Sequence, residues 1–312
     1  MMRMPRPGKT AGFTLMEAIL VIVIIGILAG IVAVFIRAPI LGYRDSVDRA
    51  EITDQADLAL RRMARDIRLA LPNSVRVSSD GSALEFLQTR SGARYLSQDD
   101  GVDSALTLNF DNASQLGFTA IAPLSSFGQV AVGDYVVVYN LGPGFEPADA
   151  YNLNDTSAGR EKNIARISAL AAANISLPGQ ATGATTPAIQ VTLADNPFAR
   201  QTTPMTSPLQ RFQVVSGPVS FYCLDRGDGT LDLWRHWGYA IPVSQAVPPA
   251  VPAGGTRALI ASRLTRCTGI FNYSSAASQR TGLAGIDLSL RGRYDSAPAI
   301  RLLHQVHIDN TP

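Results

Sequence analysis

The 312-residue sequence predicts an α+β protein in which a long N-terminal helical stem carries a predominantly antiparallel β head. Three observations lead to this class. An uninterrupted apolar run, Ala18–Ile36, lies near the N-terminus, and apolar residues then recur at helical spacing up to Pro72. Short β-type runs separated by turn residues fill the remainder. The stem is therefore expected to have a membrane half and an amphipathic half.

The apolar run is close to the ~20 residues that span a hydrocarbon core of ~30 Å as a helix. A cleaved secretory signal has a shorter apolar region of roughly 7–15 residues, so that explanation fits less well. Glu17 stands at the start of the run, where an acidic side chain costs at least ~2.5–3.5 kcal/mol and usually has a partner. Glu17 is therefore expected to have a functional partner. The alternative is that the run is only a membrane anchor and that the Glu17 side chain extends to the lipid headgroups.

Charges that flank the run predict its orientation. Arg3, Arg6 and Lys9 precede it with no acidic residue among them, which places the N-terminus in the cytoplasm and the body outside. Within the run, Gly26 and Gly30 form a small-xxx-small pair that lets another helix approach closely. Such pairs are common by chance in apolar helices. Gly26 and Pro39 could also loosen the helix locally, for which tolerated flexibility is at least as good an explanation as a hinge.

The second half of the stem follows a predicted break at Pro39–Gly42. Its apolar stripe has a 3-4 spacing, and Pro72 is expected to end the helix. The stripe comprises Ala56, Leu60, Met63, Ile67 and Leu71. Off the stripe lie Arg61, Arg62, Arg65 and Arg68. These arginines are expected to form a solvated face, the alternative being a contact with acidic groups of neighbouring molecules.

Beyond Pro72 the predicted head consists of short strands. The expected strands are Ser74–Ser78, Ala83–Gln88, Leu106–Phe110, Gly117–Ile121, Asp134–Tyr139, Ile189–Leu193, Arg211–Val215, Val219–Leu224, Leu231–Tyr239, Gly285–Leu290 and Ile300–Ile308. Glu161–Ala173 is expected to turn briefly as a helix. Three stretches are expected to be loop-like: Gly142–Asn163, Leu177–Pro208 around its one strand, and Pro242–Gly255. A boundary near residue 208 would divide the head into two β subdomains.

Few residues in the head suggest chemistry. Asp225–Gly229 contains an integrin-type tripeptide and carboxylates that could bind calcium, but a hairpin turn is the favoured interpretation. His304 and His307 lie three apart on a predicted strand and would face opposite sides. The Trp234–Trp237 segment fits core packing at least as well as sugar binding. We therefore expect no catalytic residue, no metal, no cofactor and, given a net charge of +2 with scattered basic residues, no nucleic acid.

The two cysteines, Cys223 and Cys267, form an even pair in a domain expected outside the cytoplasm, which favours one disulfide over two free thiols. Sequence alone does not show that their Cα atoms are close enough to bridge.

The hexapeptide Gly12-Phe13-Thr14-Leu15-Met16-Glu17 resembles the signal of type IV prepilins and of the pseudopilins of type II secretion. This resemblance implies a leader (residues 1–12), a transmembrane and assembly helix (13–36), an amphipathic stem (37–72) and a pilin-like β-rich extracytoplasmic head (73–312). It also implies cleavage between Gly12 and Phe13 by a prepilin peptidase and N-methylation of Phe13. Glu17 would then pair with the N-terminal amine of a neighbouring subunit.

Two later segments, Arg211–Cys223 and Leu302–Asn310, resemble minor pilins of the mannose-sensitive haemagglutinin (MSHA) pilus, in which Cys223 and Cys267 occupy the usual cysteine positions. The resemblance implies a subunit that is not an enzyme. It is expected in the bacterial inner membrane as a single-pass protein with a periplasmic head, and at the pilus tip after processing. Its implied partners are major and minor pilins and the inner-membrane assembly platform. The alternatives are a minor pseudopilin of type II secretion, an anchored enzyme and a glycan-binding adhesin.

Overall fold

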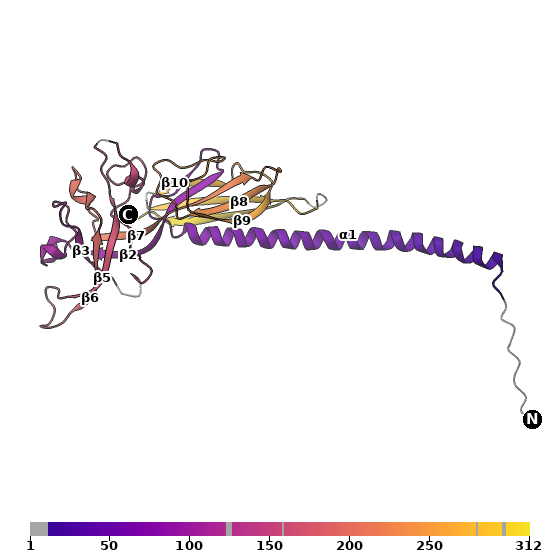
Figure 1. Cartoon of the computed structure of the whole chain (residues 1–312), viewed down its shortest axis with the longest axis horizontal. Helices are drawn as coiled ribbons and strands as arrows, with labels where there is room; N and C mark the ends of the chain where they lie inside the picture. The colour runs from indigo at the N-terminus through magenta and orange to yellow at the C-terminus, as the bar shows by residue number, and fades with distance from the viewer. Residues whose placement is uncertain (1–11, 123–126, 158, 279, 295–297) are drawn as a thin grey trace, which may run out of the picture. The chain divides into compact units, whose positions relative to one another are not determined.

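The computed structural model describes residues 12–122, 127–157, 159–278, 280–294 and 298–312. Within them the chain forms one long α-helix, α1 (Leu15–Ile67), and a sheet of twelve strands (Figure 1). A long apolar N-terminal helix and a large antiparallel sheet make an α+β layout, which confirms the predicted class at this level. Residues 1–11 of the predicted leader lie outside the described residues.

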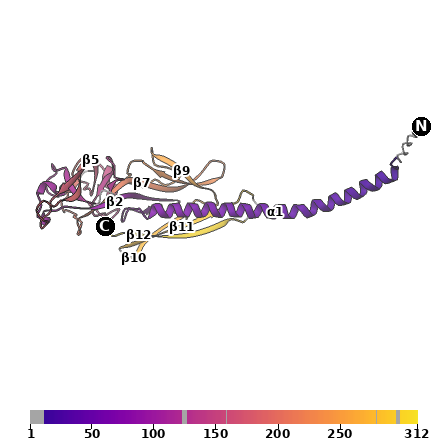
Figure 2. The same ribbon diagram turned by 90° about the horizontal axis from the view of Figure 1, so that it is seen from below.

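Helix α1 runs unbroken through Pro39, so the break expected at Pro39–Gly42 is wrong. Proline inside a helix removes one i→i−4 hydrogen bond and crowds the preceding turn, at a cost of ~3 kcal/mol. Regular helix continues on both sides of this proline, because a long helix commonly bends at an internal proline rather than ending there. Figure 2 shows α1 as a continuous ribbon that curves along its N-terminal part.

The helix ends at Ile67, whereas the sequence predicted that it would continue to Pro72. The backbone that follows pairs with a strand instead of continuing the helix. The N–H of Leu71 donates to the Leu87 carbonyl at 2.8 Å. The helical part of the stem is therefore shorter than the predicted 37–72.

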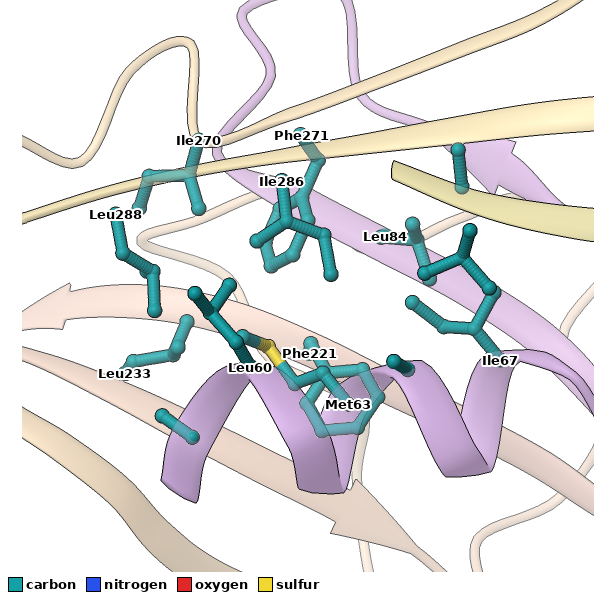
Figure 3. Close-up of a cluster of buried hydrophobic side chains, with 14 of the residues drawn as sticks. Leu60, Met63, Ile67, Leu84, Phe221, Leu233, Ile270, Phe271, Ile286 and Leu288 are labelled. Carbon is teal, nitrogen blue, oxygen red and sulfur yellow. The ribbon is translucent and has the colours of Figure 1, made fainter. Parts of the chain in front are cut away.

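The apolar stripe of α1 is buried, as its spacing predicts. Ala56, Met63 and Ile67 are fully buried, and Leu60 nearly so. Figure 3 shows Leu60, Met63 and Ile67 directed toward apolar side chains of the sheet, with Phe221 next to Met63. Each such side chain contributes ~1.5–3 kcal/mol through burial. The arginines predicted to be solvated are exposed, namely Arg61, Arg62, Arg65 and Arg68.

The strands of the sheet are β1 (Arg76–Val77), β2 (Ala83–Tyr95), β3 (Gly117–Ile121), β4 (Tyr135–Val137), β5 (Ile164–Ile175), β6 (Thr186–Leu193), β7 (Arg211–Asp225), β8 (Leu231–Trp237), β9 (Thr256–Leu264), β10 (Phe271–Ser278), β11 (Thr281–Leu290) and β12 (Ile300–Asp309). Short 3-10 helices are η1 (Gln98–Asp100), η2 (Ser104–Leu106), η3 (Ala150–Asn154) and η4 (Pro197–Arg200).

Every strand pairing is antiparallel, in the order β1-β2-β3-β6-β5-β4-β7-β8-β9-β11-β10, with β12 beside β11 and an added pairing of β2 with β7. The β2–β7 ladder runs from Ala83↔Tyr222 to Arg94↔Arg211. Its two ends contribute to different apolar clusters, one that includes α1 and one around β3 to β6. A boundary near residue 208 stays a prediction, and β7, which begins just after it, pairs with β2 and β4.

Two expected elements are wrong. Leu106–Phe110 is not a strand, because the Asn109 side chain accepts the N–H groups of Asp111 and Asn112 and holds the backbone in a local turn. Glu161–Ala173, expected to turn as a helix, belongs largely to β5, because pairing with β4 and β6 overrides the helical preference of its alanines.

Other strands differ in extent. The two strands expected at Arg211–Val215 and Val219–Leu224 are parts of β7. Two register shifts between Gln88 and Ser91 of β2 keep the two strands paired across this region. Strands β9 and β10 were not predicted.

The chain divides into two compact units, Met1–Glu51 with Gly292–Pro298, and Ile52–Arg291 with Ala299–Pro312. The first holds the apolar part of α1 and the β11–β12 loop. The second holds the rest of α1 and the sheet.

Candidate assembly site on the N-terminal helix

The first turn of α1 is capped by Thr14. Its carbonyl accepts the N–H groups of Glu17 at 3.1 Å and Ala18 at 3.2 Å, and its hydroxyl accepts the Glu17 N–H at 3.3 Å. Thr14 and Glu17 have the Thr-x-x-Glu spacing of a capping box. Sequence reasoning missed this local role, although the spacing was a signal for it. The cap fixes where the helix starts and therefore places Glu17 in its first turn.

The Glu17 carboxylate is exposed and meets no hydrogen-bond or ion-pair partner among the described residues. The positive end of the helix dipole stabilises an acid in the first turn by roughly 0.3–1 kcal/mol. That is less than the ~2.5–3.5 kcal/mol cost of placing a carboxylate in a membrane helix. Glu17 therefore needs a further cation if it enters an apolar environment.

The rest of the apolar run is also exposed. Every large apolar side chain from Ile19 to Ile36 is exposed by 41% or more. Among the described residues, α1 is the one helix long and apolar enough, by length and composition, to cross a membrane. Ideal Cβ atoms placed on Gly26 and Gly30 meet nothing within 4 Å, so their role in helix packing stays a prediction.

The proposed cleavage point lies just before the helix. Gly12 and Phe13 precede the first residue of α1, and Phe13 is 79% exposed. A Cβ atom added to Gly12 also meets nothing within 4 Å. The leader residues on the other side of Gly12 lie outside the described residues.

The structure joins Cys223 of β7 to Cys267, which lies between β9 and β10. Their Cα atoms are 5.2 Å apart, within the range a disulfide requires. Cys223 is buried in the apolar cluster that also contains Met63 of α1. The bond closes a long stretch of chain across the sheet.

The Asp225–Gly229 segment is the turn of the β7–β8 hairpin, with Asp225 paired to Leu231, which confirms the favoured interpretation. The Asp225 carboxylate accepts the N–H groups of Gly227 and Gly229, and Asp232 pairs with Arg226. The Asp228 carboxylate accepts the N–H of Thr230, so all three carboxylates of this segment have partners within the hairpin.

The other chemical candidates also lie on strands. His304 shares the face of β12 that buries Val306, and His307 lies on the exposed face, as predicted. Trp234 and Trp237 contact arginines, with Arg257 5.0 Å from the first ring and Arg235 4.6 Å from the second. In the part of the chain that the structure describes, no three His, Cys, Asp or Glu side chains gather to hold a metal.

A buried ion pair escaped sequence reasoning because its members lie on different strands. Glu85 of β2 is fully buried and accepts hydrogen bonds from Arg76 and Tyr239, each at 2.8 Å. Arg76 also donates to the carbonyls of Pro242 and Val243. Burial and the Glu85 charge raise the pKa of Tyr239 far above its usual value. This network fixes the loop that follows β8 and is structural.

Compared with protein-family models, curated proteins and solved structures, the chain gave no match. The class that the fold and this site define is therefore a coarse one. It is a β-sheet protein with one N-terminal helix fit by length and composition to cross a membrane.

Proposed function

We propose that this chain is a minor pilin-like subunit that acts in initiation or tip assembly of an MSHA-like type IV pilus. A prepilin peptidase cleaves it between Gly12 and Phe13 and methylates the new Phe13 amine. Its N-terminal helix then packs with those of major and minor pilins, under the control of an inner-membrane assembly platform. Its work is association, not catalysis.

One observation carries the proposal: Glu17 is an unpaired, exposed carboxylate at the start of an exposed apolar helix. A buried charge is tolerated when a cation and hydrogen bonds neutralise it. A cleaved neighbouring subunit supplies such a cation at its N-terminal amine. The exposed apolar side chains of the run supply the packing surface around that pair.

The construction of the stem also supports the proposal. The same helix that carries the apolar run contributes Ile52, Met63 and Ile67 to the core of the second unit. Packing of the N-terminal helices would therefore hold each folded head in the assembly through a continuous covalent element.

Processing is tested first, by mass spectrometry of the protein extracted from membranes of peptidase-positive cells. The proposal expects a chain that starts at N-methylated Phe13. A Gly12→Val variant should remain uncleaved yet folded, because a side chain at Gly12 meets open space. A wild-type chain that keeps its leader in such cells would sink the processing claim.

Assembly is tested with Glu17→Ala. This variant should insert into membranes normally but enter sheared pili poorly. Asp54→Ala is the matched control, because it removes an exposed acid from the same helix. If both variants enter pili equally well, Glu17 has no special role in assembly and the helix serves only as a membrane anchor.

The choice between a pilus and a type II secretion pseudopilus needs a deletion strain. Loss of surface pili with normal protein secretion is the expected result. Normal pili with impaired secretion would instead assign the chain to a pseudopilus.

A further inference from the structure

A small pocket of about 180 Å³ lies on the part of α1 that follows the apolar run. Two tyrosines and two arginines surround it, Tyr43, Arg44, Arg293 and Tyr294, with Val47 between them. All of these residues belong to the first compact unit. The pocket is therefore formed by the helix and the β11–β12 loop of that unit alone.

Asp48 holds the loop against the helix. This carboxylate is 3% exposed and accepts the Arg293 N–H, at 3.0 Å through one oxygen and 2.9 Å through the other. It also accepts the Tyr294 N–H at 3.5 Å. Glu51, the second acid beside the pocket, lies 3.7 Å from the Arg293 guanidinium. Backbone N–H groups therefore satisfy the Asp48 carboxylate, and the Glu51 carboxylate faces Arg293, so neither acid pairs with Arg44.

The described neighbour of Arg44 is an aromatic ring. Its guanidinium lies 5.0 Å from the centroid of the Tyr294 ring, and no carboxylate pairs with it among the residues that the structure describes. A cation–π contact orients a guanidinium without neutralising it. Tyr43 is 73% exposed and Val47 47% exposed at the same place. The lining of the pocket therefore includes the Arg44 guanidinium, two phenol groups and the apolar Val47 side chain.

The position of the pocket along the helix limits the classes of ligand that it can meet. Tyr43 follows Ile36 by seven residues, about 10 Å on an α-helix. Side chains of a helix lean toward its N-terminus, here toward the apolar run. The headgroup layer extends roughly 5–7 Å beyond the hydrocarbon. Tyrosine and arginine side chains favour the headgroup layer, and both kinds line this pocket.

We infer that this pocket binds the headgroup of an anionic phospholipid, with Arg44 on the phosphate and the tyrosines beside the glycerol. This inference rests on the membrane-spanning part of the proposed function. An acidic protein surface would also suit Arg44, but the exposed Tyr43 and Val47 next to a membrane segment favour a lipid. Tyr294 is a positioning residue that keeps Arg44 in place.

The test uses the full chain reconstituted in phosphatidylcholine vesicles that carry spin-labelled phosphatidylglycerol or spin-labelled phosphatidylcholine. The motionally restricted fraction of each label measures its association with the protein. Wild type should select phosphatidylglycerol. Arg44→Gln should reduce its association by about fivefold, the equivalent of the ~1 kcal/mol typical of one basic residue at a membrane surface.

Three further variants separate a built site from diffuse charge. Tyr294→Leu keeps the net charge but removes the ring under Arg44, so selectivity should fall, and Tyr294→Phe should retain it. Arg49→Gln is the matched control, because it removes one positive charge from an exposed position outside the pocket. Equal effects of Arg44→Gln and Arg49→Gln, with none from Tyr294→Leu, would overturn the site.

Flotation of the same vesicles distinguishes the two levels of failure. A chain that floats with the vesicles but shows no selectivity overturns the lipid site alone and leaves an acidic protein as the occupant. A chain that does not float contradicts the membrane-spanning helix itself, and the lipid site with it.

Discussion

The Nε–H of Arg235 donates to the Asp66 carboxylate at 2.6 Å and so ties β8 to the final turns of α1. Both side chains are largely shielded, and the guanidinium also lies over the Trp237 ring. Asp66 is thereby directed at the sheet. It does not neutralise the arginines on the outer face of the helix.

Loss of this pair should destabilise the second unit. Asp66→Ala leaves a shielded guanidinium unpaired, and hydrogen bonds to charged groups contribute roughly 1.5–3 kcal/mol. We expect a loss of that size in the free energy of unfolding, measured by urea titration with tryptophan fluorescence. Asp57→Ala breaks the exposed Asp57–Arg61 pair on the same helix and should cost less than about 0.5 kcal/mol. Equal losses in the two variants would contradict the role of the Asp66 pair.

The buried stripe of α1 should dominate the stability of the core. Met63 is fully buried among side chains of α1 and the sheet, so Met63→Ala should cost about 2–5 kcal/mol. Leu58→Ala is the control, since Leu58 is 67% exposed on the opposite face and its loss should change stability by less than about 0.5 kcal/mol. The same titration checks both. A loss of stability in Met63→Ala as small as that in Leu58→Ala would mean that the helix is not an integral part of this core.

The Asp287 carboxylate should make stability depend on pH. Hydrogen bonds from Arg301, together with the positive charges of Arg266 and Arg301, lower the pKa of Asp287 below its ordinary value of 3.8. A lowered folded-state pKa contributes stability above the unfolded value, and that stability is lost as pH falls below about 3.8.

Asp287→Asn should therefore be less stable than wild type at pH 7, with the difference shrinking toward pH 3. Urea titrations at both values measure it, and Asp54→Asn on the exposed stem serves as the control. A difference that stays constant between the two pH values would show that the charge of Asp287 is not the cause.

The Cys223–Cys267 bond should stabilise the sheet by restricting the unfolded chain. With 44 residues of separation, the loop-closure relation gives about 4 kcal/mol, the upper part of the usual range. The Cys223→Ser, Cys267→Ser double variant should lose stability of this order against the oxidised wild type. Thiol labelling before and after reduction reports the bond directly, and full labelling of the unreduced, unfolded protein would show that it does not form.

Local pattern allowed several parts of this protein to be predicted. The apolar run, the stripe through Met63 and Ile67, strand β3 and the β7–β8 turn all follow from periodicity or turn residues that neighbours in sequence share. For the candidate site, sequence placed Gly12, Phe13 and Glu17 together. The Thr14 cap is equally local, because Thr14 and Glu17 lie three residues apart in the first turn of the helix.

What the sequence by itself determined, then, is a helix that is apolar at its start, bears an acid in its first turn and has one buried stripe, followed by strands. The tertiary structure decided where that helix ends and that the alanine-rich β5 is a strand. It also decided that Arg76 donates to Glu85 and that the Arg293 N–H donates to Asp48. Periodicity reports which face of an element avoids water, and that is a property of the segment alone. Partners far apart in the chain are brought together only by the packing of the whole fold, so ion pairs, helix ends and pockets cannot be read from one segment.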